Sequence, residues 1–179
     1  MIETKRLLLR AWKASDLEPF ARLNADPRAM EFMFKSLTRE ESDNWVERMR
    51  AQMLERGFMH YAVELKDGGN FIGAIGLSVP SYETHFSPFG EIGWRILPEF
   101  WGHGFATEGA KAMLIHGSEK LGLSEIVAFT VPMNVRSRCV MEKIGMVRDE
   151  ADDFDHPRIP AGHPLQRHVL YRWHKRDVK

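Results

Sequence analysis

The chain has 179 residues, of which 25 are Lys or Arg and 25 are Asp or Glu, so its formal net charge is zero. This balance predicts no global attraction to nucleic acid or to a membrane surface. The single cysteine, Cys139, excludes an internal disulfide framework, no apolar run approaches a membrane span, and the first residues lack the apolar stretch of a signal peptide. We therefore expect one cytoplasmic domain that spans residues 1–179.

The first third of the sequence predicts a strand followed by helices. The apolar run over 6–12 is typical of a strand, and a Met- and Phe-rich piece over 30–34 predicts a short helical turn. A Ser or Thr followed three residues later by Glu is the spacing of a capping box, which marks helix starts at Ser15 with Glu18 and at Thr38 with Glu41. The second of these helices should end at Gly57.

The rest of the sequence alternates strands with helices. β-branched and alternating runs predict strands over 60–65, 71–78, 91–96, 125–130 and 167–173. The first two of these form a hairpin, and a loop over 80–88 leads to the third. A helix that begins near Ala106 separates the strands 91–96 and 125–130, which predicts a parallel crossover between them.

The stretch 98–111 joins this strand to this helix and contains two glycines, Gly102 and Gly104. Bare backbone at the positive end of a helix dipole lets several consecutive N–H groups point at one anion, so the stretch predicts a phosphate cradle. Its spacing is neither that of a Walker loop nor that of the dinucleotide fingerprint. A tight turn without a ligand is the alternative interpretation.

The same stretch resembles the pyrophosphate loop of the GNAT acetyltransferases, whose Gln/Arg-x-x-Gly-x-Gly/Ala pattern falls on Trp101, Gly104 and Ala106. Trp101 departs from the usual first residue. An aromatic residue there is ordinary in the ribosomal-protein N-terminal acetyltransferase branch, which the longer string over 100–108 resembles.

A second motif about thirty residues later resembles the same family, in which Asn-x-x-Ser/Ala is followed by a helix that ends Glu-Lys-x-Gly. The matching residues are Asn134, Ser137, Glu142, Lys143 and Gly145. Two motifs in the right order are far more specific than either alone, and the resemblance covers residues 6–147.

The resemblance implies an α/β GNAT fold, with a mixed central sheet of about seven strands splayed at the middle and about four helices. It implies direct transfer of an acetyl group from acetyl-CoA to a primary amine, without a metal ion, by a monomer or homodimer. Acetyl-CoA would lie in the splayed sheet, held by Trp94, Ile96, Leu97, Trp101, Gly102, His103, Gly104, Phe105, Ala106, Thr107, Asn134 and Ser137.

The reaction needs a base, because an alkylamine with a pKa near 10.4 arrives protonated. Glu91 opens the strand that would face the thioester and is our first candidate; a surface carboxylate is the alternative. His163 and His168 are weaker candidates.

The reaction also needs an acid for the leaving thiolate. Many family members use a Tyr on the helix after the second motif, but this position is Met141 here. Ser137 is our first choice, Tyr171 is a second, and a thiolate that leaves unaided is a third. We interpret Cys139 as a buried small residue rather than a nucleophile.

The acceptor is less defined. Five carboxylates between Asp149 and Asp155 would attract a cationic amine, although a solvated turn is the simpler interpretation. The branch resemblance favours a peptide or protein N-terminus, and small amines stay open. Two rival functions also stay open, a catalytically silent acetyl-CoA sensor or interaction module, and a protein that binds ATP through the glycine loop.

Overall fold

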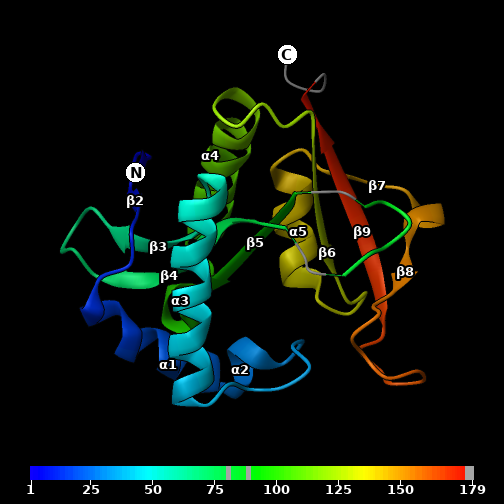
Figure 1. Cartoon of the computed structure of the whole chain (residues 1–179), viewed down its shortest axis with the longest axis horizontal. Helices are drawn as coiled ribbons and strands as arrows, with labels where there is room; N and C mark the ends of the chain where they lie inside the picture. The colour runs from blue at the N-terminus through cyan, green and yellow to red at the C-terminus, as the bar shows by residue number, and fades with distance from the viewer. Residues whose placement is uncertain (80–81, 88–89, 176–179) are drawn as a thin grey trace.

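The computed structural model describes residues 1–79, 82–87 and 90–175 of the chain (Figure 1). Nine strands lie within these ranges: β1 (Ile2–Glu3), β2 (Leu7–Arg10), β3 (His60–Leu65), β4 (Phe71–Ser78), β5 (Glu91–Ile96), β6 (Glu125–Thr130), β7 (Val147–Arg148), β8 (Phe154–Asp155) and β9 (Arg167–His174). The same ranges hold five α-helices: α1 (Leu17–Ala25), α2 (Pro27–Met30), α3 (Arg39–Arg56), α4 (Phe105–Glu119) and α5 (Val135–Lys143). Both ends of the predicted loop 80–88 lie outside the described residues.

The strands form a mixed sheet in the order β1-β2-β3-β4-β5-β6-β9-β7, with β8 paired to β9. The pairs are antiparallel except that β5 and β6 run parallel, because α4 carries the chain from the end of one to the start of the other. Three of the strands, β1, β7 and β8, have only two residues and are too short to show a sequence pattern. The predicted α/β architecture is confirmed.

The sheet opens between β5 and β6. Among the described residues, the ladder between these strands consists of the pair Glu91 and Val127, and the Val127 amide donates to the Gly90 carbonyl at 2.9 Å. Figure 1 shows the two strands diverging from this point. The far side of β6 pairs with β9 along its whole length, so β6 stays in the sheet while it leaves β5. The predicted splay is confirmed.

Helices cover both faces of the sheet. A Cβ atom at Gly109 of α4 would stand 2.5 Å from Cδ1 of Ile75 in β4, so only glycine lets the helix lie this close to the strand. Side chains alternate along a strand, so Arg95 of β5 points to the opposite face. There it lies near the rings of Phe20 in α1 and Trp45 in α3.

One of the two predicted capping boxes is confirmed. The Thr38 hydroxyl accepts from the Glu41 amide at 3.2 Å, and the Glu41 carboxylate accepts from the Thr38 amide at 2.9 Å. The helix that follows ends at Gly57, which has φ 77° as a left-handed cap.

The other capping box, at Ser15 with Glu18, is wrong. A 3₁₀ turn over Ala14–Asp16 precedes α1, and the Asp16 carboxylate accepts from the Lys13 amide at 2.7 Å. Asp16 also receives two hydrogen bonds from the buried Arg10 guanidinium, at 2.6 and 2.9 Å. This pair joins the end of β2 to the turn six residues later, so Asp16 and not Ser15 makes the hydrogen bonds at the start of the turn.

Candidate active site

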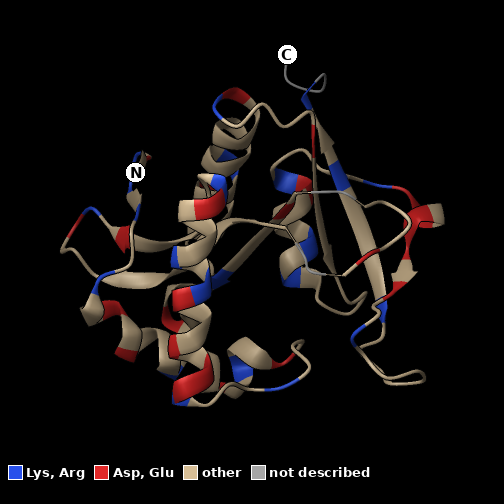
Figure 2. Cartoon of the chain, viewed as in Figure 1, with Lys and Arg blue, Asp and Glu red and all other residues tan. Residues whose placement is uncertain are grey.

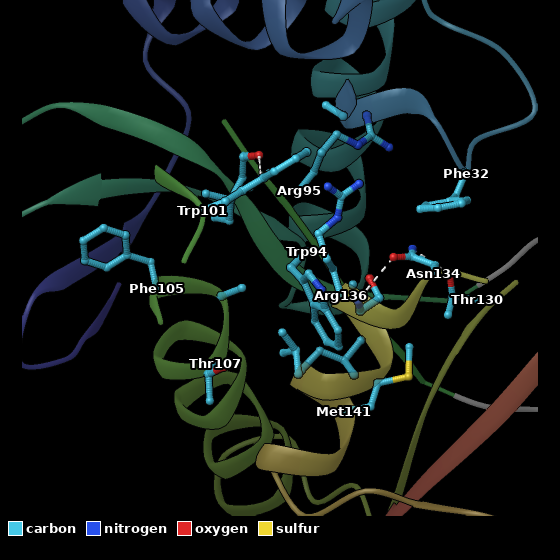
Figure 3. Close-up of a pocket in the computed structure, with 18 of the residues that line it drawn as sticks. Phe32, Trp94, Arg95, Trp101, Phe105, Thr107, Thr130, Asn134, Arg136 and Met141 are labelled. Carbon is cyan, nitrogen blue, oxygen red and sulfur yellow. Dashed lines mark hydrogen bonds between the residues drawn. The ribbon is translucent and has the colours of Figure 1, made fainter. Parts of the chain in front are cut away.

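A cavity of about 850 Å³ lies at the opening between β5 and β6. Its wall combines β5, the loop before α4, the first turn of α4, one side of α5, and parts of α1, α2 and α3 (Figure 3). Ten of the predicted cofactor residues line it, namely Trp94, Ile96, Trp101, Gly102, Gly104, Phe105, Ala106, Thr107, Asn134 and Ser137. The structure therefore brings the two sequence motifs together around one space.

The glycine loop presents unused backbone donors. Gly102 and Gly104 have φ 79° and 78°, a left-handed conformation that favours glycine. Within the described part of the chain, the amides of residues 102–107 have no hydrogen-bond acceptor; the first bond of α4 runs from the Glu108 amide to the Gly104 carbonyl at 3.0 Å. These amides lie at the N-terminus of a 15-residue helix. They can bind an anion such as a diphosphate.

Arg6 of the N-terminal segment holds this loop in place. Its Nη1 donates to the His103 carbonyl at 2.9 Å, and its Nε donates to the Glu108 carboxylate at 2.6 Å. The guanidinium also lies 4.5 Å above the Phe105 ring. Arg6 thus binds one loop carbonyl and no loop amide, so the loop amides stay available to a ligand. His103 itself is exposed and lies outside the cavity wall, so it contributes backbone at most.

The edge of β5 that faces the opening offers further donors. The Leu97 amide donates to the Ile72 carbonyl of β4 at 2.9 Å, and alternation along an antiparallel strand places the Trp94 and Ile96 amides on the other edge. Beyond Glu91 that edge has no partner strand among the described residues. The prediction that Leu97 offers its N–H to the cofactor is therefore wrong, because β4 uses that group.

The opposite wall is the start of α5. The Asn134 side chain caps this helix by accepting from the Ser137 amide at 3.2 Å, and its amide group donates to the Thr130 hydroxyl at 2.9 Å. In Figure 3, side chains of α4 and α5 lie on either side of Trp94. The Ser137 hydroxyl makes no hydrogen bond with the described residues, so it can turn toward a ligand. Met141 is buried and lines the cavity where the family Tyr would stand.

Glu91 lies in the cavity wall, where burial raises its pKa to about 7 although a hydrogen bond from Ser78 opposes the shift. It is the only acidic side chain among the described residues of the wall. A carboxylate with this pKa can take up and release a proton near neutral pH. The structure therefore places the first predicted base at the cavity.

The second-choice acid, Tyr171, and the weaker base candidates, His163 and His168, lie outside the cavity wall. The Tyr171 hydroxyl donates to the Glu142 carboxylate at 2.9 Å, and the His163 ring packs against Phe34 with 5.5 Å between centroids. His168 is buried 5.0 Å from the His156 ring, and burial lowers its pKa. No group of three or more His, Cys, Asp or Glu in the described residues is arranged to hold a metal ion. That the reaction needs no metal stays a prediction.

Cys139 is exposed rather than buried, so the sequence interpretation was wrong. Its position on α5 places it in the cavity wall. The helix packs on the sheet through other residues, such as Met141, which is 2% exposed.

The acidic segment 149–155 lies at the outer edge of the molecule, as Figure 2 shows, and not in the cavity wall. Its carboxylates pair with the protein's own arginines: Asp152 with Arg172 at 2.7 Å, and Asp153 with Arg148 at 2.5 Å. The segment therefore does not line this cavity.

Sequence analysis missed Arg95 and His60, which line the part of the cavity that α1 and α3 cover. Arg95 shares a strand face with Glu91, four residues earlier, so period-2 alternation could have revealed it. The nearness of His60 could not be read from the sequence, because it depends on the register of β3 against β4, in which His60 pairs with Gly76.

The family model for the acetyltransferase (GNAT) domain matches residues 6–147. The chain belongs to the GNAT acetyltransferase family. Several of the similar proteins are themselves named acetyltransferases, which supports an acetyltransferase activity for this chain. It is 31% identical over 153 residues to the uncharacterized N-acetyltransferase YnaD of Bacillus subtilis, which covers 83% of each chain.

Solved structures show the same fold. A GNAT-family acetyltransferase from Bacillus anthracis superposes with a TM-score of 0.79 at 28% identity, covering 97% of each chain. A spermidine N-acetyltransferase from Vibrio cholerae, in complex with CoA and spermine, gives 0.74 at 21% identity and covers 96% of each chain. At that identity the second likeness concerns the fold alone.

Proposed function

We propose that this acetyltransferase binds acetyl-CoA in the opening between β5 and β6 and transfers its acetyl group directly to a primary amine. The observation that supports this proposal is the set of unused amides over 102–107 beside an unpaired strand edge. The loop amides suit the diphosphate, and the Trp94 and Ile96 edge suits the amides of the pantetheine arm, which would lie along it like an added strand. The Vibrio cholerae structure in complex with CoA is consistent with this choice.

Bound acetyl-CoA supplies an acetyl thioester, from which the acetyl group passes to the amine nitrogen as the carbon–sulfur bond breaks. Glu91 accepts the proton that the ammonium must lose, directly or through a water. An N–H on the open edge of β5, such as that of Trp94, stabilises negative charge on the acetyl oxygen. The Ser137 hydroxyl donates a proton to the leaving sulfur and takes up the second proton that the nitrogen loses after the attack, so the products are the amide, free CoA and a proton on Glu91.

The acceptor is proposed at the level of a primary amine. The branch resemblance suggests a peptide or protein N-terminus, and a small cationic amine is the other candidate. The wall contains Arg28, Arg95, Arg136, Lys143 and Arg158, against the single carboxylate of Glu91 among its described residues. This charge distribution gives little support to a polycation.

We also propose that residues 1–179 act as one cytoplasmic domain. Strand β9, which follows the residues of both family motifs, pairs with β6 and β7 and so belongs to the same sheet. None of the described helices is long and apolar enough to cross a membrane.

An acceptor screen that reads CoA release tests the proposed function. We expect acetyl-CoA to raise the melting temperature, ATP to leave it unchanged, and at least one amine to release CoA. Glu91→Gln should lower kcat by about 10²-fold or more at neutral pH and leave the Kd of acetyl-CoA unchanged. CoA release from no amine in a broad panel, or tight binding of ATP instead of acetyl-CoA, would overturn the proposal.

A further inference from the structure

The two faces of β5 divide the cavity. Trp94 pairs with Ile75, which α4 covers through Gly109, so the face with Trp94 and Ile96 adjoins the proposed cofactor loop. Glu91 and Arg95 point to the other face, which α1 and α3 cover. That face is the side from which an acceptor would reach Glu91.

Arg95 lies on this acceptor side without an acidic partner. One of its guanidinium nitrogens, Nη1, donates to the Asn24 side-chain oxygen, and the group lies 5.9 Å from the Phe20 ring and 6.0 Å from the Trp45 ring. Asn24 is itself held by a 2.8 Å hydrogen bond to the Ser42 hydroxyl. No carboxylate in the described part of the chain forms an ion pair with Arg95, and burial lowers its pKa to about 10.

The neighbouring His60 does not compensate this charge. Burial and the nearby Arg95 lower the pKa of His60 to about 3, so the imidazole is neutral. Its Nδ1 is buried and has no hydrogen-bond partner among the described residues. The wall at this point therefore holds a cation surrounded by an amide, a neutral imidazole and aromatic rings.

Two other arginines of the same cavity differ from Arg95. Arg28 pairs with Asp26 at 2.7 Å, and Arg136 pairs with Glu31 at 2.8 Å. Both are exposed, so water solvates them as well. Arg95 is only partly exposed, and a cation in such a place without a counter-ion is costly, so the missing charge can come from a ligand.

We propose that the acceptor is an amine that also carries a carboxylate, which binds to Arg95 while the amine lies at Glu91. This proposal rests on the proposed function. Four strand residues separate the two positions by roughly 13 Å between Cα atoms, so the acceptor's charged ends lie several bonds apart. The rings of Phe20 and Trp45, both in the cavity wall, suit an apolar chain between them.

A matched panel of six-carbon amines tests this proposal on the wild-type enzyme. The panel consists of 6-aminohexanoate, its neutral amide, hexylamine and 1,6-diaminohexane, each assayed by CoA release. We expect kcat/KM for 6-aminohexanoate to exceed that for the others by about 10-fold or more, since hydrogen bonds to charged groups contribute roughly 1.5–3 kcal/mol. 4-Aminobutyrate serves as the shorter homologue that reports the spacing.

The same panel assayed on variants of Arg95 is the second test. Arg95→Gln should abolish the preference for the carboxylate, and Arg95→Lys should keep part of it. Arg39→Gln, an exposed arginine of α3 that pairs with Asp43 outside the cavity, is the matched control and should keep the preference.

The outcomes separate the two proposals. If no amine releases CoA, the proposed function fails. If CoA is released but the amide or the diamine matches 6-aminohexanoate, the proposed function stands and the role of Arg95 is overturned. The wild-type panel decides this point even if the Arg95 variants do not fold.

Discussion

Replacement of Glu91 by Gln should make the protein more stable at alkaline pH. Burial raises the pKa of this carboxyl from 4.5 to about 7, so the folded protein binds its proton more tightly than the unfolded chain does. The stability that this proton contributes is present at low pH and is lost as pH rises from about 4.5 to about 7. At 1.36 kcal/mol per pKa unit, the loss is ~3 kcal/mol at pH 8.

Gln cannot ionise, so the variant should not show this loss. Urea unfolding at pH 4.5 and pH 8 measures it: we expect equal free energies of unfolding at pH 4.5, and a variant more stable by ~2–4 kcal/mol at pH 8. Glu55→Gln is the control, because this carboxylate of α3 is 70% exposed, and its substitution should leave the pH dependence unchanged.

The titration of Glu91 should also appear in the pH dependence of kcat/KM. A base with a pKa of about 7 is protonated below that pH, so kcat/KM of the wild type should rise through pH 7, and the rise should be absent in Glu91→Gln. If the wild type and Glu91→Gln show the same stability difference at both pH values, Glu91 does not titrate near 7, and the burial argument is refuted.

Three further substitutions test the loop and α5. Gly104→Ala should raise the Kd of acetyl-CoA about tenfold by calorimetry, because an alanine needs roughly 1–2 kcal/mol to adopt the left-handed conformation of the loop. Gly122→Ala is the control: this glycine has φ 71° beyond the other end of α4, and its substitution should leave the Kd unchanged. Equal losses of affinity in the two variants would contradict the loop assignment. Asn134→Ala removes the α5 cap and should lower Tm by about 2–4 °C, whereas an unchanged Tm would show that the cap does not stabilise the fold. Ser137→Ala should lower kcat and spare the Kd of acetyl-CoA; an unaltered kcat would remove Ser137 as proton donor.

Local sequence signals were enough for much of the fold. The strands 60–65, 71–78, 91–96 and 125–130 have the predicted bounds, because each combines a β-forming run with turn residues at its ends. The box of Thr38 and Glu41 is also local, since both partners lie within one helical turn. Ser15 and Glu18 have the same spacing, but the buried pair of Asp16 and Arg10 depends on how β2 meets the turn, which spacing does not report.

The candidate site was predictable where function depends on backbone. Glycines in a left-handed turn before a helix indicate an anion cradle whatever side chains surround them, and Gly102 and Gly104 have that conformation. The surroundings of individual side chains could not be predicted from the sequence in this way. The burial of Glu91, the isolation of Arg95 and the exposure of Cys139 follow from which helix covers each face of the sheet.

A crystal structure of the protein soaked with CoA is the most direct test of how the cleft is used. We expect diphosphate oxygens within hydrogen-bonding distance of amides in 102–107, and the pantetheine arm between β5 and β6 along the Trp94 edge. A diphosphate bound elsewhere, with these amides facing solvent, or β5 and β6 closed into a continuous ladder, would contradict the proposed acetyl-CoA site.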